Sequence, residues 1–354
     1  MHERAEADAG CMGVRLTLPL ACRAGTSEVV LEPAHCEWLF RLAAYSAVRD
    51  GRVGMGEQVV CRLVPGVVRD HHQSALCLAS LAIELHDARG RLAARTDVSA
   101  EVFAPFVEAR AARLWARAAV DGGTELGPVR FTLHAGPAVE SPFPVSIPRL
   151  PSVSLATLSE ARAVGKPDRG WVTTVIEPAV ITGLDALETM SRSLGVEAAG
   201  RIHGRVGFDA ERRCFVRVLE QLVPTRETTA NATAVLSRAE SWGEFLASVP
   251  SDGPSAGSQA HTHLHTRRPD GSEGDGLDAT APPVISADDR ISLLVDYPDS
   301  LSASLILSLY DDRRVLKIYG CAADGRLREE PGWFLHPGSA AAMRLPDPEW
   351  EVSA

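Results

Sequence analysis

The chain has 354 residues, which is long for one domain and sufficient for two. Hydrophobic residues make up 45% of the chain and charged residues 23%, so ordinary apolar cores are expected. The formal net charge of −10, without a dense basic stripe, argues against nucleic acid as a main partner.

Residues 1–136 have the pattern of a separate α+β domain. Strand-like alternation or a short apolar run occurs in these segments: 14–20, 59–64, 78–86, 91–98 and 129–134. The third and fourth of them flank Asp87-Ala-Arg-Gly90 and predict a hairpin. Apolar residues at helical spacing predict two helices: 33–49 and 101–120. The segment has no nucleotide-binding glycine loop, and we expect it to bind a substrate or a partner protein.

A proline-rich connection, residues 137–165, follows this domain. Prolines recur through its first half, from Pro137 to Pro151. Repeated prolines interrupt backbone hydrogen bonding and favour extended chain. We therefore place the domain boundary here, with a second domain at 166–337 and a tail at 338–354.

The second domain is predicted to begin with a strand over 171–176 and a helix. Thr182-x-x-Asp185 can cap this helix, and Gly195 can end it. Apolar residues at helical spacing form the stripe that should face the core: Leu184, Leu187, Met190 and Leu194.

Alternation over 196–206 then predicts a strand, and residues 214–223 should pair with it across the turn at 208–212. One face of the first strand is apolar or small. The other face carries the charged and polar side chains: Glu197, Arg201, His203 and Arg205.

The remaining elements of the second domain are short. We expect the following, in chain order: a strand at 233–236, a helix at 241–248, a helix at 287–295, and a hairpin of 304–309 with 315–319. Gly, Asp, Ser and Arg dominate 267–280, where no apolar period survives. The insertion 265–283 is therefore predicted to be a flexible, exposed loop.

Three histidines, His261, His263 and His265, alternate in Gln-Ala-His-Thr-His-Leu-His. In an extended segment alternate side chains share a face, so His261 and His263 can reach one metal ion, and His265 could reach it too. Imidazole suits Zn²⁺, and a carboxylate can complete three protein ligands beside an open position for water. The alternative is a polar surface strand or loop whose histidines bind nothing.

Two other features carry groups that hydrolysis needs. Ser286 and Asp289 lie three residues apart at a predicted helix start, where one turn brings both oxygens near the same point. Simple helix capping is the alternative for this pair. Glu197 could act as a general base, or it could be a surface glutamate of its strand. Gly200 and Gly204 could serve only to let a helix approach that strand closely.

The order and spacing of Glu197-Ala-Ala-Gly200, His261-Thr-His263 and Ser286-Ala-Asp-Asp289 resemble the JAMM/MPN (JAB-domain) zinc metalloproteases. The resemblance covers about residues 171–337, near half of the chain. It implies an α+β or mixed α/β architecture, in which an MPN/JAB-like (cytidine-deaminase-like) domain has a mixed sheet with flanking helices.

The same resemblance implies a role for each motif residue. His261, His263 and Asp289 would bind zinc, and Glu197 would take a proton from the water and give it to the leaving amine. Ser286 would hydrogen-bond the oxyanion. Family members cleave peptide or isopeptide bonds after the C-terminal tail of ubiquitin or a ubiquitin-like protein.

The sequence departs from that family at two places. Leu264-His265 stands where the family has proline soon after His-x-His, so a site of three histidines is an alternative to the site with Asp289. Residues 264–285 separate His263 from Ser286, whereas the family has about seven residues there. This longer insertion could grip the substrate as a lid, or it could displace Ser286 and Asp289.

The cysteines and the N-terminal residues are used to predict the cellular compartment of the protein. Seven scattered cysteines, without a Cys-x-x-Cys, favour reduced thiols over a disulfide framework. The polar, acidic start lacks the apolar stretch of a signal peptide, and no run of about 18 apolar residues suggests a membrane span. We therefore expect a cytoplasmic protein without a membrane partner.

These observations together predict a zinc isopeptidase that trims or removes a ubiquitin-like modifier. The Ala, Arg, Gly and Val bias is typical of a GC-rich bacterial genome, so we expect a bacterial system resembling ubiquitin conjugation. Its partners would be the modifier, its conjugates, and the activating or conjugating enzymes. The alternatives are a non-catalytic MPN scaffold and a protease that processes a ubiquitin-fold sulfur-carrier protein.

Overall fold

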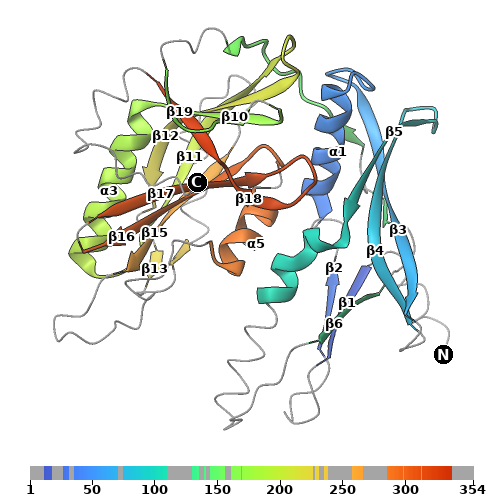
Figure 1. Ribbon diagram of the computed structural model, residues 1–354, viewed down its shortest axis with the longest axis horizontal. Helices are drawn as coiled ribbons and strands as arrows, with labels where there is room; N and C mark the ends of the chain where they lie inside the picture. Colours follow the sequence, from blue (N-terminus) through green and yellow to red (C-terminus); the bar gives the residue numbers. More distant parts are fainter. Residues whose placement is uncertain are drawn as a thin grey trace. The chain divides into compact units, whose positions relative to one another are not determined.

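The computed structural model of the chain (Figure 1) describes residues 12–17, 27–31, 36–70, 75–109, 130–134, 139–140, 144–155, 161–168, 170–225, 228–230, 235–237, 257–265, 285–297, 299–311 and 313–336. They form a mixed α and β structure with few helices. The chain divides into two compact units, and each is described by itself.

The division between the units differs in one respect from the predicted domains. The first unit comprises residues 1–148, 286–300 and 323–326, and the second comprises 149–285, 301–322 and 327–354. The boundary at Pro148 lies inside the predicted linker 137–165. Segment 286–300, which the sequence pattern places in the second domain, is counted with the first unit.

The first unit is built on an eight-stranded antiparallel sheet with the order β2-β1-β6-β4-β3-β7, in which β5 lies beside β4 and β8 beside β3. Its strands are β1 (Met12–Thr17), β2 (Ser27–Leu31), β3 (Gln58–Asp70), β4 (Ala75–His86), β5 (Leu92–Ser99), β6 (Arg130–His134), β7 (Val139–Glu140) and β8 (Val145–Ser146). The predicted hairpin is confirmed: β4 and β5 pair across a turn in which Gly90 has φ +73°.

The helices of the first unit agree in part with the prediction. α1 (Glu37–Arg49) buries Trp38, Leu39 and Leu42 and packs against β3, β4 and β5. The helix predicted over 101–120 begins as the 3-10 turn η2 (Ala100–Phe103), and its residues after 109 lie outside the described part of the chain. α5 (Ala287–Val295) has the predicted bounds.

The expectation that prolines keep 137–165 out of regular pairing is wrong. β7 and β8 both pair with β3, and β9 (Arg162–Gly165) pairs with a strand of the second unit's sheet, to which it belongs. Pro144 and Pro148 flank β8 and do not interrupt it, so the pairing survives.

The second unit is built on a nine-stranded mixed sheet with the order β18-β17-β16-β15-β11-β12-β10-β19-β9. Its further strands are β10 (Val172–Ile176), β11 (Ala199–Asp209), β12 (Cys214–Pro224), β15 (Ser258–His265), β16 (Ala303–Tyr310), β17 (Arg314–Cys321), β18 (Leu327–Glu329) and β19 (Gly332–Leu335). A separate two-stranded sheet pairs β13 (Thr228–Ala230) with β14 (Val235–Ser237). The strands predicted at 171–176, 196–206 and 214–223, and the hairpin of β16 with β17, are confirmed.

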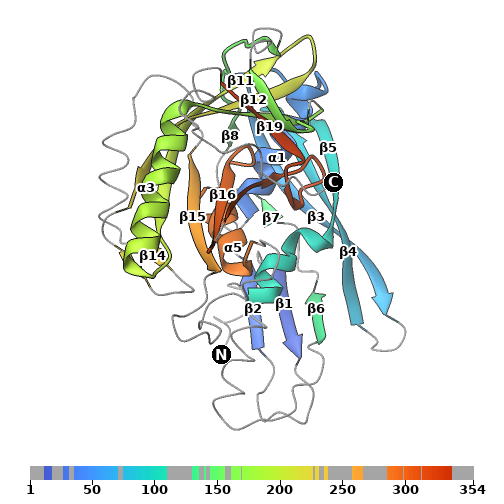
Figure 2. The same cartoon turned by 60° about the vertical axis from the view of Figure 1, so that its left-hand side comes forward.

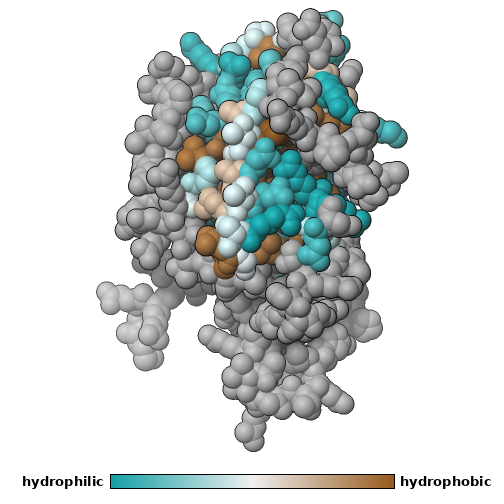
Figure 3. All heavy atoms as spheres, turned by 90° about the vertical axis from the view of Figure 1, so that its left-hand side faces the viewer, coloured by the Kyte–Doolittle hydropathy of each residue, from teal (hydrophilic) through white to brown (hydrophobic). Residues whose placement is uncertain are grey.

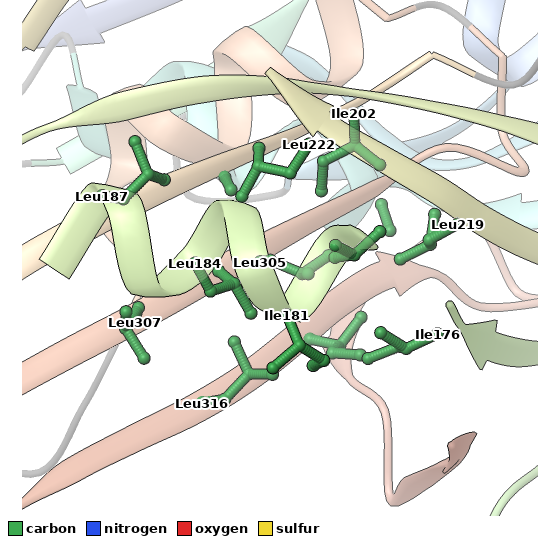
Figure 4. Packing of buried hydrophobic residues seen from close by; sticks show 14 of the residues in the cluster. Ile176, Ile181, Leu184, Leu187, Ile202, Leu219, Leu222, Leu305, Leu307 and Leu316 are labelled. Carbon is green, nitrogen blue, oxygen red and sulfur yellow. The ribbon is translucent and has the colours of Figure 1, made fainter. Parts of the chain in front are cut away.

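α3 (Pro178–Leu194) lies along one face of this sheet (Figure 2). Its Ile181, Leu184 and Leu187 point into a cluster of strand residues that includes Leu305 and Leu307 (Figure 4). Figure 3 shows the surface on the side of α3. Hydrophilic residues form a broad area there, and hydrophobic residues form smaller areas beside it.

Two details of α3 correct the prediction. The helix begins at Pro178, so Thr182 lies inside it and donates to the Pro178 carbonyl oxygen (3.3 Å) instead of capping it. Leu194 is 67% exposed, so it does not continue the apolar stripe. Gly195 ends the helix at φ 65°, as predicted.

Three predicted segments lie outside the described residues: the helix at 241–248, the loop at 267–280 and the tail at 338–354. Among the helices that are described, none is both long and apolar enough to cross a membrane.

Candidate functional site

The three histidines lie on β15, an inner strand of the second unit's sheet between β11 and β16. Ala260 and Leu264 belong to the core beneath α3, and the Thr262 hydroxyl lies 3.0 Å from that of Ser191 on α3. Because side chains alternate along a strand, His261, His263 and His265 share the opposite face. We call this surface of the sheet, on β11, β15 and β16, the histidine face.

Glu197 lies two residues before the start of β11. The Thr262 amide donates to the Ala198 carbonyl oxygen (2.8 Å), and Ala199 is paired with His261. Ala198 is in the core with α3. Glu197 is 7% exposed, which excludes the alternative of a surface glutamate.

Close approach of β12 to β11 explains the two glycines of the predicted motif. A Cβ on Gly200 would lie 2.6 Å from the Leu222 Cδ1 atom, and one on Gly204 would lie 2.3 Å from the Val218 carbonyl oxygen. Both positions therefore need glycine for packing, but the tight neighbour is the strand β12 and not a helix as expected; α3 is in ordinary contact at Gly200 alone, through Leu187 (3.5 Å). A bulge between His203 and Gly204 also shifts the pairing of β11 with β12.

The histidine face carries several buried polar side chains, whereas His261 is half-buried. The exposed fractions of its side chains are 5% for His263, 0% for His265, 8% for Arg201 and 3% for Gln259. The amide of Gln259 donates to the Ser304 hydroxyl (3.3 Å) on the neighbouring strand. Burying polar groups costs free energy unless they are hydrogen-bonded, so a face of this composition is not expected from packing alone.

His265 is held in a different way from the other two histidines. Its ring stacks on Tyr310, with centroids 4.5 Å apart and planes inclined by 20°. The Arg313 guanidinium lies 4.8 Å from the Tyr310 centroid. Burial raises the pKa of Tyr310, and Arg313 partly opposes that rise, so the phenol is neutral at ordinary pH. The sequence pattern did not reveal this stack, which depends on Tyr310 pairing with His265 across β15 and β16.

Ser286 and Asp289 form a complete capping box at the start of α5. The Asp289 amide donates to the Ser286 hydroxyl oxygen (3.0 Å), and the Ser286 amide donates to the Asp289 carboxylate (3.3 Å). The Ser286 hydroxyl is also 2.6 Å from that carboxylate. This is the capping alternative considered for the pair. Both residues belong to the first compact unit, whereas Glu197 and the histidines belong to the second.

The structure thus places His261 and His263 on one face of β15, with Glu197 just before the neighbouring strand β11, and it does not assemble the full predicted ligand set in one unit. Within the described parts of the chain, no group of three or more His, Cys, Asp or Glu side chains is arranged to hold a metal ion. Two imidazoles beside a carboxylate are nevertheless a donor set that suits zinc chemistry.

Comparison with known proteins does not assign the chain to a family. No protein-family model matches the chain, and no curated protein matches it either. The resemblance to JAMM/MPN proteases therefore depends on the three motifs and on the histidine face.

Proposed function

We propose that the chain is a zinc-dependent peptidase or isopeptidase, with His261, His263 and Asp289 as zinc ligands. The observation that carries the proposal is the face of β15 that His261 and His263 share, with the buried Glu197 just before the neighbouring strand β11. The succession of α3, the Glu197 strand, the histidine strand and the Ser286 helix also supports an MPN/JAB-like domain. Asp289 is included as a ligand only because of the order of the motifs in the sequence.

Each residue has a distinct role in this proposal. Bound zinc lowers the pKa of a coordinated water to about 7. The Glu197 carboxylate accepts a proton from the attacking water, whose oxygen bonds to the carbonyl carbon, and then gives that proton to the departing amine nitrogen. The Ser286 hydroxyl donates a hydrogen bond to the oxyanion. The buried position of Glu197 strengthens these interactions because bulk water does not compete for them.

The proposed substrate is the bond that follows the C-terminal tail of a ubiquitin-like modifier in a bacterial conjugation system. The modifier's conjugates and its activating or conjugating enzymes are the proposed partners. A ubiquitin-fold sulfur carrier would present a tail of the same chemistry.

A non-catalytic MPN scaffold is the second candidate function. The capping box of Ser286 and Asp289 favours it, because both side chains already have a structural role. The two candidates differ in what Glu197 does, since a scaffold needs no general base.

The test combines zinc content with turnover. Wild-type protein prepared with ample zinc is expected to hold one ion per chain, and Asp289→Ala is expected to lose more zinc than His265→Ala. Glu197→Gln is expected to keep its zinc and to cleave a panel of linear ubiquitin-like fusions about 10²–10⁴-fold more slowly, because an amide cannot accept the water's proton.

Glu220→Gln is the matched control for this experiment. Glu220 lies on β12 of the same sheet, pairs with Arg205 (3.2 Å) and His203 (3.4 Å), and has no role in the proposed chemistry. Its amide variant should cleave at the wild-type rate. Absence of zinc from the wild type, or equal cleavage by zinc-loaded Glu197→Gln, would contradict the proposed chemistry.

A further inference from the structure

The helix α5, with Ser286 at its N-cap and Asp289 in its first turn, is held by a hydrogen bond within the first unit. α1 packs against α5. Asp299 lies just after the end of α5, and the Tyr45 hydroxyl on α1 donates to its carboxylate (3.0 Å). Because the two residues are 254 positions apart in the sequence, this bond ties α5 to a remote part of the chain.

The bond between Tyr45 and Asp299 is largely shielded from water. Tyr45 is 2% exposed, and Asp299 is half-buried. Burial, and after it the charge of Asp299, raises the pKa of Tyr45 well above its ordinary value, so the phenol is a neutral donor at ordinary pH. A hydrogen bond to an ionised acceptor is stronger than one between neutral groups, and water replaces it poorly at a buried position.

Arg41 adds a positive charge to the same contact. It lies one turn before Tyr45 on α1, and its guanidinium donates to Glu37 (3.2 Å). Burial lowers the pKa of Arg41, but the charge of Asp299 and the bond with Glu37 outweigh burial and raise that pKa. Asp299 is therefore attracted to α1 by a charge as well as by the tyrosine hydroxyl.

A second polar contact of α5 with the first unit is more exposed. Arg290 forms an ion pair with Glu108, whose side chain is 49% exposed. Exposed ion pairs contribute little to stability because water and salt screen them. Of these two contacts, the bond between Tyr45 and Asp299 is therefore expected to be the stronger.

We propose that Tyr45 and Asp299 are positioning residues that anchor the C-terminal end of α5 to α1 and thereby restrain Ser286 and Asp289 at the other end. The helix has nine residues, and its continuous backbone hydrogen bonds make it move as one body. The first unit thus has the role of placing α5. The effect on zinc rests on the proposed function, in which Asp289 is a ligand, whereas the anchor does not.

Hydrogen exchange of the metal-free protein tests the anchor. Tyr45→Phe removes only the hydroxyl, and exchange of the α5 amides is expected to become about 10–100-fold faster, as the loss of a hydrogen bond to a charged group implies. Asp299→Asn keeps an oxygen that can accept from Tyr45, so a smaller increase is expected. Glu108→Gln is the matched control on the same helix and should exchange nearly as the wild type does.

A further control separates anchoring from a general loss of stability. Asp87→Asn changes a side chain that accepts from the Arg89 and Arg91 amides in the turn between β4 and β5. It should speed exchange in that turn and leave α5 unchanged. Unchanged α5 exchange in Tyr45→Phe would overturn the inference. An equal increase over α5, β3 and β4 would also overturn it, because the bond would then stabilise the whole unit.

Zinc affinity, measured by competition with a chromophoric chelator, tests whether the anchor acts through Asp289. Tyr45→Phe is expected to bind zinc about 2–30-fold more weakly, as for residues that couple to a site without touching it, with Glu108→Gln and Asp87→Asn near the wild type. In an Asp289→Ala background, Tyr45→Phe should have no further effect, because the ligand that the anchor places is gone.

Unchanged affinity in Tyr45→Phe, or an effect that persists without the Asp289 carboxylate, would overturn the positioning role towards the metal. A wild type that binds no zinc would refute the proposed function, and hydrogen exchange would still decide whether Tyr45 and Asp299 anchor α5.

Discussion

The buried pair of Arg217 and Glu330 in the second unit gives the sharpest stability prediction. Arg217 on β12 is 1% exposed and forms an ion pair with Glu330. Its guanidinium also donates to the Thr174 hydroxyl (2.6 Å) and to the carbonyl oxygens of Leu301 (2.7 Å) and Ser302 (3.0 Å). The Thr174 hydroxyl in turn donates to Glu330 (2.6 Å). Among the described residues, the Arg217 Nε atom is buried without a hydrogen-bond partner.

Glu330→Gln is expected to lower the free energy of unfolding of this unit by about 3–5 kcal/mol, because it leaves a buried guanidinium without its counter-charge. Removal of Arg217 instead would leave the Glu330 carboxylate without its counter-charge. This carboxylate is partly hydrated, because the Glu330 side chain is 14% exposed. Arg217→Met with Glu330→Leu should therefore cost less than the sum of the two single changes, since it removes both charges.

Glu329→Gln is the control, because Glu329 pairs with Lys317 (2.7 Å) and is 34% exposed, and such pairs contribute at most about 1 kcal/mol. Unfolding in urea is monitored by hydrogen exchange of the amides of β10 and β12, which reports on the second unit alone. A global signal would combine the unfolding of both units. A loss below about 1 kcal/mol in Glu330→Gln would refute the reasoning that the guanidinium depends on this carboxylate.

Two further predictions concern backbone packing and pH. Gly183→Ala in α3 should destabilise the second unit by about 1–3 kcal/mol in urea titration, because the added Cβ would lie 2.5 Å from that of Leu222; unchanged stability would show that Leu222 can move aside. Backbone hydrogen bonds from Arg91 lower the pKa of Asp87 to about 2, so its stabilisation of the β4–β5 turn is present above the ordinary aspartate value and is lost as pH falls towards 2. The difference in melting temperature between the wild type and Asp87→Asn should therefore shrink over that acid range, and a constant difference would contradict the assignment.

Periodicity predicted the regular elements wherever one face of a strand or helix is buried. The 196–206 strand alternates because Gly200 and Ile202 face α3 while Arg201 faces away. The start of α3 was misplaced because Thr182-x-x-Asp185 looks like a cap, whereas Pro178 at the first helical position was the better signal. The short strands β7 and β8 pair with β3, which is remote from them in sequence. A local sequence pattern does not predict such a pairing.

The shared face of His261 and His263 could be predicted because it needs only a strand. The position of Glu197 just before the strand that pairs with β15 could not, because it depends on the register of two segments about sixty residues apart. The same holds for the stack of His265 on Tyr310. The capping role of Ser286 and Asp289 could be predicted, since Ser-x-x-Asp at a helix start is a local signal.

β16 carries an observation that supports the proposed chemistry of the histidine face. All eight of its residues are buried, yet its two sides differ: Leu305, Leu307 and Leu309 pack beneath α3, while Ser304 and Ser308 face the other way. A strand selected for stability alone would carry apolar residues on both buried faces, because each hydroxyl that lacks a partner costs free energy. The Ser304 hydroxyl accepts from Gln259, but the Ser308 hydroxyl has no partner among the described residues, so serine at position 308 sacrifices stability. A sequence usually departs from its best packing where a binding or catalytic group is needed. Since Ser308 stands beside His263, the departure coincides with the ligand strand of the proposed zinc site.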